Sequence, residues 1–166
     1  MKYYFNSKGT QYIQFQNVEI LSNRDFSFDF WFMTSDSNYG RIWDFGRAET
    51  VISYMATNQR TYLYYEPERY IEYTRGQWNH LLYQYDSDKQ CISLYINGIL
   101  KAMEFDQIIL TPDLFYLAKS TWGADPIANI KYTGIRIQYN ILFKPPELTP
   151  WGLKYVNSLH SNISTN

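Results

Sequence analysis

The feature that most constrains the fold of this sequence is the run at positions 26–33, FSFDFWFM, in which every second residue is phenylalanine. The four phenylalanines fall on one face of an extended chain, and Ser27, Asp29 and Trp31 fall on the other. A helix would scatter the same residues around its axis. The run therefore predicts a β-strand with one buried face.

The same alternation recurs at positions 77–86, 91–98 and 134–140, and shorter strand candidates lie at 13–15, 42–45, 51–57 and 114–118. Clusters of Asn, Asp, Ser, Gly and Pro separate these segments, as turns require. Many short strands spaced this way predict an all-β, two-sheet antiparallel sandwich. The predicted core is the alternating set Phe26, Phe28, Phe30, Phe32, Leu81, Tyr83, Ile92, Leu94, Ile96, Ile135 and Ile137. The opposite parity, represented by Ser27, Asp29, Ser93 and Arg136, is expected to be more exposed.

Two hairpins are expected from their turn residues. Asn97-Gly98 joins two apolar runs, and Asn-Gly is a strong two-residue turn signal. The second turn is assigned to the four residues that begin at Glu66 and end at Arg69, because Pro67 then occupies a position where its fixed φ is favourable.

A short helix is expected only near the C-terminus. Thr149 can cap it and Pro150 suits its first position. Three apolar residues then share one helical face, at Trp151, Tyr155 and Leu159. The final residues, HSNISTN, form a polar tail that should fray.

Length and composition favour a single domain, 1–166, with a core at about 10–155. The net charge of −1 gives no basic surface for nucleic acid. The sequence contains no run of 18 apolar residues, which a membrane-spanning helix would need. Cys91 is the one cysteine, which excludes an intrachain disulfide and a thiolate metal cluster; we expect it to be buried. The first residues do not read as a signal peptide. An extracellular or virion-surface location is nonetheless expected for a recognition domain.

In order along the chain, these segments resemble the concanavalin A-like jelly roll, and within it the laminin G-like and pentraxin-like group. The resemblance is carried by YIQFQNVEI, FSFDFWF, GRIWDFG, LFYLAKSTWG and IKYTGIRIQYNILF, and most of all by GQWNHLLYQYDSDKQCISLYING, whose Trp-His and Asn-Gly pairs match the family's hairpin. It covers roughly residues 10–155. It implies two curved antiparallel sheets whose first and last strands share one sheet, here the strands at 13–15 and 135–139. It also implies glycan or protein binding at rim loops or on the concave face, often with calcium.

The calcium implied by the resemblance is not expected here. Where pentraxins carry acidic and amide ligands, this chain has Lys119, Ser120 and Thr121. Calcium needs six to eight oxygen ligands, usually with several carboxylates. The sequence therefore predicts no bound metal or other cofactor.

The superfamily also includes glucanases, whose resemblance would imply a catalytic carboxylate pair. The nearest arrangement is Glu66-Pro67-Glu68, which we assign to a hairpin turn rather than to an active site, since Pro67 cannot donate to a sheet. His80 is interpreted as a structural strand residue and His160 lies in the tail. No recognised catalytic or phosphate-binding motif is present. The chain is expected not to be an enzyme.

The candidate ligand-binding residues lie in two loops. Trp122 and Asp125 occupy the first, where an indole can stack on a sugar ring and a carboxylate can accept its hydroxyls; Gly123 between them is expected to permit a sharp turn. Alternatively, Trp122 folds back onto the edge of the sandwich. Asn38 and Tyr39 occupy the second loop, which plain turn chemistry also explains.

The sequence thus favours a non-catalytic, lectin-like recognition module that binds carbohydrate through rim loops. The alternative is a structural, adhesive or decoration protein of a phage or viral particle, which would form a homo-oligomer or a larger assembly through protein surfaces. A third hypothesis, glycoside hydrolysis, rests on fold analogy alone.

Overall fold

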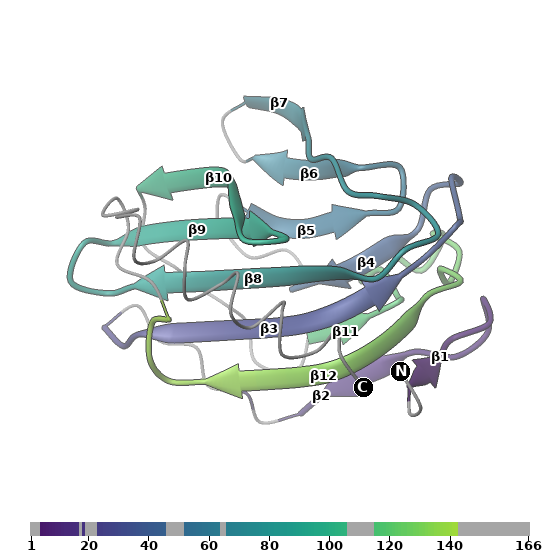
Figure 1. The fold of residues 1–166 in the computed structure, drawn as a ribbon, viewed down its shortest axis with the longest axis horizontal. Helices are drawn as coiled ribbons and strands as arrows, with labels where there is room; N and C mark the ends of the chain where they lie inside the picture. Colours follow the sequence, from purple (N-terminus) through teal and green to yellow (C-terminus); the bar gives the residue numbers. More distant parts are fainter. Residues whose placement is uncertain are drawn as a thin grey trace.

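The computed structural model describes residues 4–16, 18, 23–45, 52–63, 66–105 and 115–142, which form two six-stranded antiparallel sheets packed face to face (Figure 1). Sheet A has the strand order β1 (Phe5–Asn6), β12 (Lys131–Gln138), β3 (Phe26–Met33), β8 (Asn79–Asp86), β9 (Cys91–Ile96) and β10 (Ile99–Phe105). Sheet B has the order β2 (Ile13–Phe15), β11 (Phe115–Leu117), β4 (Arg41–Asp44), β5 (Ile52–Ala56), β6 (Arg60–Leu63) and β7 (Glu66–Tyr70). The all-β sandwich predicted from the alternation is confirmed. The predicted C-terminal helix and tail lie outside the described residues.

The core fills the space between the two sheets and is largely aromatic. Phe28 lies at its centre: its ring packs on Tyr83 within sheet A and on Trp43, Phe45 and Phe115 from the sheet B side, with ring centroids 4.9–5.9 Å apart. The predicted residues of β3, β8 and β9 are all buried in this cluster. Ile135 and Ile137 are only partly buried and pack against its margin. Cys91 is buried, as expected.

The outer face of sheet A is also covered, which the sequence did not predict. Ser27, Asp29 and Ser93 were expected to be exposed, and all three are buried; only Arg136 of that set is exposed. Alternation predicts that one face of a strand is buried but says nothing about a layer added later onto the other face. Here a second small apolar cluster covers that face, formed by Leu82 and Tyr95 with Leu100 and Leu142 packed against them.

The buried carboxylate of Asp29 on this face is satisfied by two neighbouring side chains. Asp29 accepts hydrogen bonds from Arg136, 2.6 Å from Nη2, and lies 3.0 Å from Nε2 of His80. The ring of Trp31, whose position the sequence left open, packs at 5.1 Å on His80 and is nearly buried. His80 is therefore a structural strand residue, as predicted.

The expectation that the strands at 13–15 and 135–139 share one sheet is wrong. Ile13–Phe15 forms β2 in sheet B, whereas β12 lies in sheet A. The strand that pairs with β12 is β1, through Phe5 opposite Tyr132 and Asn6 opposite Lys131. A strand of two residues has no alternation to reveal it, so only its tertiary pairing defines it.

The two predicted hairpins have different outcomes. The Asn97-Gly98 turn joins β9 and β10 with positive φ at both residues, as a two-residue turn of type I′ requires. The second predicted turn is wrong, because Glu66 already pairs with Leu63 and the segment assigned to the turn belongs to β7. β7 lies at the edge of sheet B, where Pro67 is tolerated in a strand.

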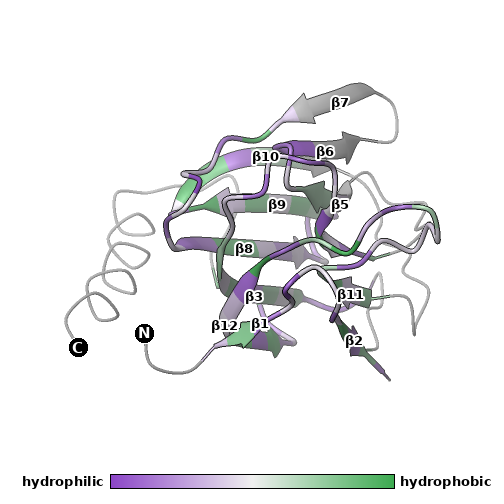
Figure 2. Cartoon of the chain, turned by 90° about the vertical axis from the view of Figure 1, so that its right-hand side faces the viewer, coloured by the Kyte–Doolittle hydropathy of each residue, from purple (hydrophilic) through white to green (hydrophobic). Residues whose placement is uncertain are grey.

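Six connections gather at one end of the sandwich: residues 7–12, 34–40, 57–59, 71–78, 97–98 and 118–130. We call this end the rim, and Figure 2 looks onto it. Both loops proposed from the sequence as binding loops belong to it. Within the described residues, the structure contains no helix that could cross a membrane.

Replacing Leu94 with alanine should lower the free energy of unfolding by about 2–5 kcal/mol, because the side chain is fully buried in the main core and its removal leaves a cavity. Ile99→Ala is the matched control on the same hairpin, since Ile99 is 57% exposed, and it should cost far less. Urea denaturation measures both. Equal losses for the two variants would contradict the register of β9.

Candidate functional site

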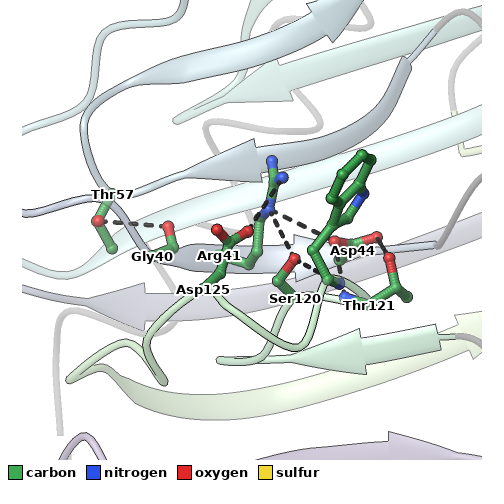
Figure 3. Close-up of polar contacts among 8 residues, drawn as sticks. Gly40, Arg41, Asp44, Thr57, Ser120, Thr121 and Asp125 are labelled. Atoms are coloured by element: carbon green, nitrogen blue, oxygen red, sulfur yellow. Dashed lines mark hydrogen bonds and ion pairs between the residues drawn. The ribbon is translucent and has the colours of Figure 1, made fainter.

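The two candidate loops meet at the rim. A Cβ added to Gly40 would lie 2.9 Å from Cβ of Ala128, so the glycine is what allows the loop at 34–40 to approach the loop at 118–130. Thr57 fixes the first loop to the β5–β6 turn, because its N–H donates to the carbonyl of Gly40 at 2.8 Å. Its hydroxyl donates to the same carbonyl at 3.3 Å (Figure 3). Ala128 is itself held by a 2.9 Å bond from its N–H to the carbonyl of Ala118. The loops are thus parts of one packed unit.

A β-bulge in β4 creates the charged centre of the site. Arg41 pairs with Ala56 and Trp43 with Met55, so Ile42 is an extra residue opposite β5. A bulge reverses the alternation of a strand. In consequence Ile42 and Trp43 both enter the core, and Arg41 and Asp44 come together on the other face, where a regular strand would separate them.

Arg41 links both loops to this face. Its Nε lies 3.4 Å from Asp44 Oδ2 and 3.4 Å from Ser120 Oγ, and its Nη2 lies 3.4 Å from Asp125 Oδ2 (Figure 3). The guanidinium also lies over the ring of Tyr54, at 3.3 Å from the centroid. The side chain is only 5% exposed. A buried guanidinium between two carboxylates holds the surrounding backbone in one arrangement.

The loop that carries Trp122 is fixed by hydrogen bonds on each side of the indole. Ser120 Oγ accepts from the N–H of Trp122 at 3.0 Å, and the N–H of Thr121 donates to Asp44 at 3.2 Å. The N–H of Asp125 donates to the carbonyl of Trp122 at 3.1 Å, which closes a turn. The indole nevertheless remains 54% exposed. It does not fold back onto the sandwich edge.

The residue with a positive φ in this loop is not the glycine at its turn. Gly123 was expected to permit a sharp turn, but its φ is not positive and a Cβ there would meet nothing within 4 Å, so the turn does not require a glycine at this position. The positive φ of the loop is at Ala118, at 66°, where the chain leaves β11. The direction of the loop is therefore set at its start.

Of the second predicted pair, Tyr39 contacts Arg41 through its side chain, whereas Asn38 forms hydrogen bonds through its backbone. Tyr39 is half-buried beside Arg41, whose guanidinium carbon lies 5.0 Å from the ring centroid. Burial raises the pKa of the Tyr39 hydroxyl, and the nearby Arg41 charge partly opposes the rise. Asn38 contributes through its backbone: its N–H donates to Asp36 at 3.0 Å, and its carbonyl accepts from Thr57. Arg41 thus connects Tyr39 with Asp125. Asn38 is exposed and belongs to the site only because it precedes Tyr39 in the chain.

The residues that sequence reasoning missed are Arg41, Asp44 and Tyr54. The available signal was a charged pair at spacing three inside an otherwise apolar strand, in GRIWDFG. On a regular strand that spacing places the two charges on opposite faces. Only the bulge, which the sequence does not reveal, brings them together.

The described residues do not fit calcium at this site. The cation-binding position between Asp44 and Asp125 is already taken by the Arg41 guanidinium. Lys119, in the segment where the resemblance placed calcium ligands, directs its ammonium over the rings of Tyr12 and Tyr116, at 4.2 and 5.0 Å. No group of three or more His, Cys, Asp or Glu side chains occurs in the described part of the chain.

Gly40→Ala should destabilise the domain by about 1–3 kcal/mol, because the new methyl group overlaps Ala128 and must push the two loops apart. Gly123→Ala is the matched control, since its Cβ would meet nothing within 4 Å. Thermal unfolding of the two variants tests this difference. A Gly40→Ala variant as stable as the control would show that the loops are not packed together.

Two curved six-stranded sheets with a loop-built site at the rim define a jelly-roll sandwich of the lectin type. The chain belongs to the concanavalin A-like lectin/glucanases superfamily, and the family's sequence model matches residues 7–130. A comparison with curated protein sequences gives no significant match.

Several solved structures are similar in fold. Domain 4 of a GH43 extracellular arabinanase from Geobacillus stearothermophilus, in complex with arabinotriose, aligns with a TM-score of 0.58 at 18% identity, over 90% of this chain and 73% of that chain. The binding domain of Paraclostridial Mosquitocidal Protein 1 aligns with a TM-score of 0.61 at 14% identity, over 98% and 43%. Trypanosoma rangeli sialidase aligns with a TM-score of 0.60 at 12% identity, over 87% and 24%. The chain therefore spans about a quarter of the sialidase and under half of the mosquitocidal protein domain.

Proposed function

We propose that this domain is a non-catalytic recognition module that binds carbohydrate at the rim, with Trp122 as the stacking surface and Asp125 as a hydroxyl acceptor. The observation that carries the proposal is the exposure of the Trp122 indole on a loop that is otherwise held in place. Burying a large apolar side chain stabilises a protein by about 1.5–3 kcal/mol. A fixed loop that leaves its largest apolar group in water suits a ligand-binding role.

Two further features support a sugar ligand. The carboxylate of Asp125 is partly exposed and lies in the same turn as Trp122, so an acceptor accompanies the aromatic face. A similar fold occurs in an arabinanase domain whose structure contains arabinotriose. Tyr39 and Asn38 would border the ligand on the side of the second loop.

A glycan array, probed with and without calcium, tests the proposal. The wild-type domain should bind a defined group of glycans, and Trp122→Ala should lose the same signals. A wild-type domain that binds no glycan on the array, or binding that persists unchanged in the variant, would contradict the proposal.

The absence of catalysis is part of the proposal. The two carboxylates at the site are both engaged by Arg41, whereas a retaining glycosidase needs two carboxyl groups about 5–5.5 Å apart that flank the sugar bond. The glutamates at positions 66 and 68 lie in a strand and not in a turn. The turn assignment therefore no longer excludes a catalytic role for them. Oligosaccharide hydrolysis that is abolished in E66Q/E68Q would show that the domain is an enzyme.

The assembly hypothesis, in which the domain is an adhesive or decoration protein of a particle, predicts a discrete oligomer. Light scattering measures the mass of the protein in solution and so distinguishes the two proposals. We expect a monomer for a recognition module. A stable oligomer without glycan binding would favour assembly.

We also propose that ligand binding needs no calcium. A metal that binds the native state stabilises it by mass action, so a specific site would raise the melting temperature on addition of the ion. We expect no change in melting temperature with millimolar calcium or with a chelator, because Arg41 already lies between the carboxylates. A large rise that the chelator reverses would reveal a site among other residues.

A further inference from the structure

A second concave region opens on the same rim, apart from Trp122. It is a hollow of about 620 Å³ bounded by the start of the loop at 34–40, the loop at 71–78 and the end of the loop at 118–130. The residues that line it are Met33, Thr34, Ser35, Asp36, Gly76, Asn129 and Lys131.

The hollow is held in shape by bonds that do not use its exposed groups. The hydroxyl of Thr34 donates to the carbonyl of Asn129 at 2.8 Å, and the N–H of Gly76 donates to the carbonyl of Thr34 at 2.8 Å. Gly76 has a φ of 70°, which L-residues rarely adopt. The three segments are therefore joined by hydrogen bonds through Thr34, as a preformed site requires.

The side chains that face the hollow retain hydrogen-bonding capacity. Asp36 uses one carboxylate oxygen to accept from Asn38, at 3.0 Å. Within the described residues, its other oxygen, the hydroxyl of Ser35 and the side-chain amide of Asn129 make no hydrogen bond. The ammonium of Lys131 contacts the ring of Tyr4, at 5.2 Å, and no hydrogen-bond acceptor within the same residues.

The charges of this set indicate the class of ligand. The charges of the Asp36 carboxylate and the Lys131 ammonium nearly cancel. The hollow therefore has no net charge that would favour an anion or a cation. Hydroxyl groups both donate and accept, and they match a mixed set of carboxylate, amide, hydroxyl and ammonium groups. The chemistry therefore favours a neutral, hydroxyl-rich ligand.

An aromatic wall stands beside these groups. Tyr4 is 46% exposed, and its ring meets that of Trp78 edge to face at 6.2 Å. Lys131 joins this pair to the hollow. Trp78 lies just before β8 and is half-buried at the rim.

The hollow and the Trp122 site are borne by the same two loops. Asn129 follows Asp125 by four residues, so their Cα atoms lie within about 14 Å of each other. Resting on the carbohydrate-binding function proposed above, we propose that the hollow is a second subsite for a neutral saccharide. The rim then binds an oligosaccharide at two places, Trp122 and Asp125 at one and Asp36, Asn129 and Lys131 at the other.

The test is a calorimetric titration with neutral arabinan- and glucan-derived oligosaccharides, from mono- to hexasaccharide, of wild type, W122A and N129A/K131M. The matched control is N140A/K101M, which alters the same residue types away from this hollow. For wild type we expect the affinity to rise at least about tenfold with chain length, as one charge-assisted hydrogen bond would provide. N129A/K131M should lose this rise while keeping its affinity for short ligands, whereas W122A should weaken binding of every length.

The outcomes separate the two proposals. If the wild type binds no member of the series, the proposed function fails and the second subsite fails with it. If the wild type binds but N129A/K131M behaves like wild type at every length, the second subsite alone is overturned. Equal melting temperatures for N129A/K131M and its control establish that any loss reflects binding and not unfolding.

Discussion

Replacing Trp122 with alanine should weaken glycan binding by at least about 30-fold while leaving the melting temperature within a few degrees of wild type. Aromatic anchors at the centre of an interface commonly contribute 2 kcal/mol or more to binding, which corresponds to that factor. The stability should change little, because more than half of the indole surface is already in water. The loop also keeps its shape through Ser120 and Asp44, whose bonds go to backbone N–H groups that the substitution retains.

The matched control is Tyr139→Ala, an aromatic residue that is 42% exposed and follows β12 at the opposite end of the sandwich. It should bind glycan like wild type. Trp122→Phe should retain part of the affinity, since a smaller ring still stacks. If Trp122→Ala unfolds readily, the indole is a structural element, and the carbohydrate proposal loses its main anchor.

The fold could be predicted from the sequence because alternation reports burial directly. Phe26 and its three partners in β3, with Leu94 and its neighbours in β9, form one face of the core as their parity requires. The Asn97-Gly98 turn was predictable for a local reason, since few other residues accept positive φ at two successive positions. These features depend on a few consecutive residues.

The features that were missed depend on contacts between distant residues. β1 exists only because Phe5 and Asn6 pair with β12. Asp29 is buried because Arg136 and His80 satisfy its charge on a face that is covered by another layer. Alternation cannot report either effect, since each is created by a partner far along the chain.

The site was predictable in its exposed part alone. Trp122 and Asp125 could be proposed because large aromatic and acidic residues are conspicuous in a loop. Arg41, which connects their loop to Tyr39, lies in a strand that reads as ordinary sheet, and the bulge that turns it toward Asp44 leaves no mark in the sequence. Exposed candidate residues can therefore be proposed from the sequence, whereas the residues that hold their loops in place cannot.

Arg41 provides the largest expected effect on stability. Arg41→Met should lower the free energy of unfolding by about 3–5 kcal/mol, because removing one partner of a buried ion pair leaves the other charge uncompensated. The Asp44 side chain is only 3% exposed and that of Asp125 only 20%, so water can stabilise neither fully. Arg41→Lys should recover only part of the loss, since a single ammonium cannot reach Asp44, Ser120 and Asp125 together.

The triple variant R41M/D44N/D125N separates the charge from the shape of the site. Replacing the carboxylates with amides removes the uncompensated charge, so we expect it to regain at least half of the stability that Arg41→Met loses, as measured by urea denaturation. Glycan binding should remain weak in the triple variant, because no guanidinium then holds the Trp122 loop against β4. Losing an exposed ion pair typically costs about 1 kcal/mol or less. If the free energy of unfolding of the single variant Arg41→Met lies within about 1 kcal/mol of wild type, the buried ion pairs do not form in solution. Arg41 would then be no part of what positions the binding loops.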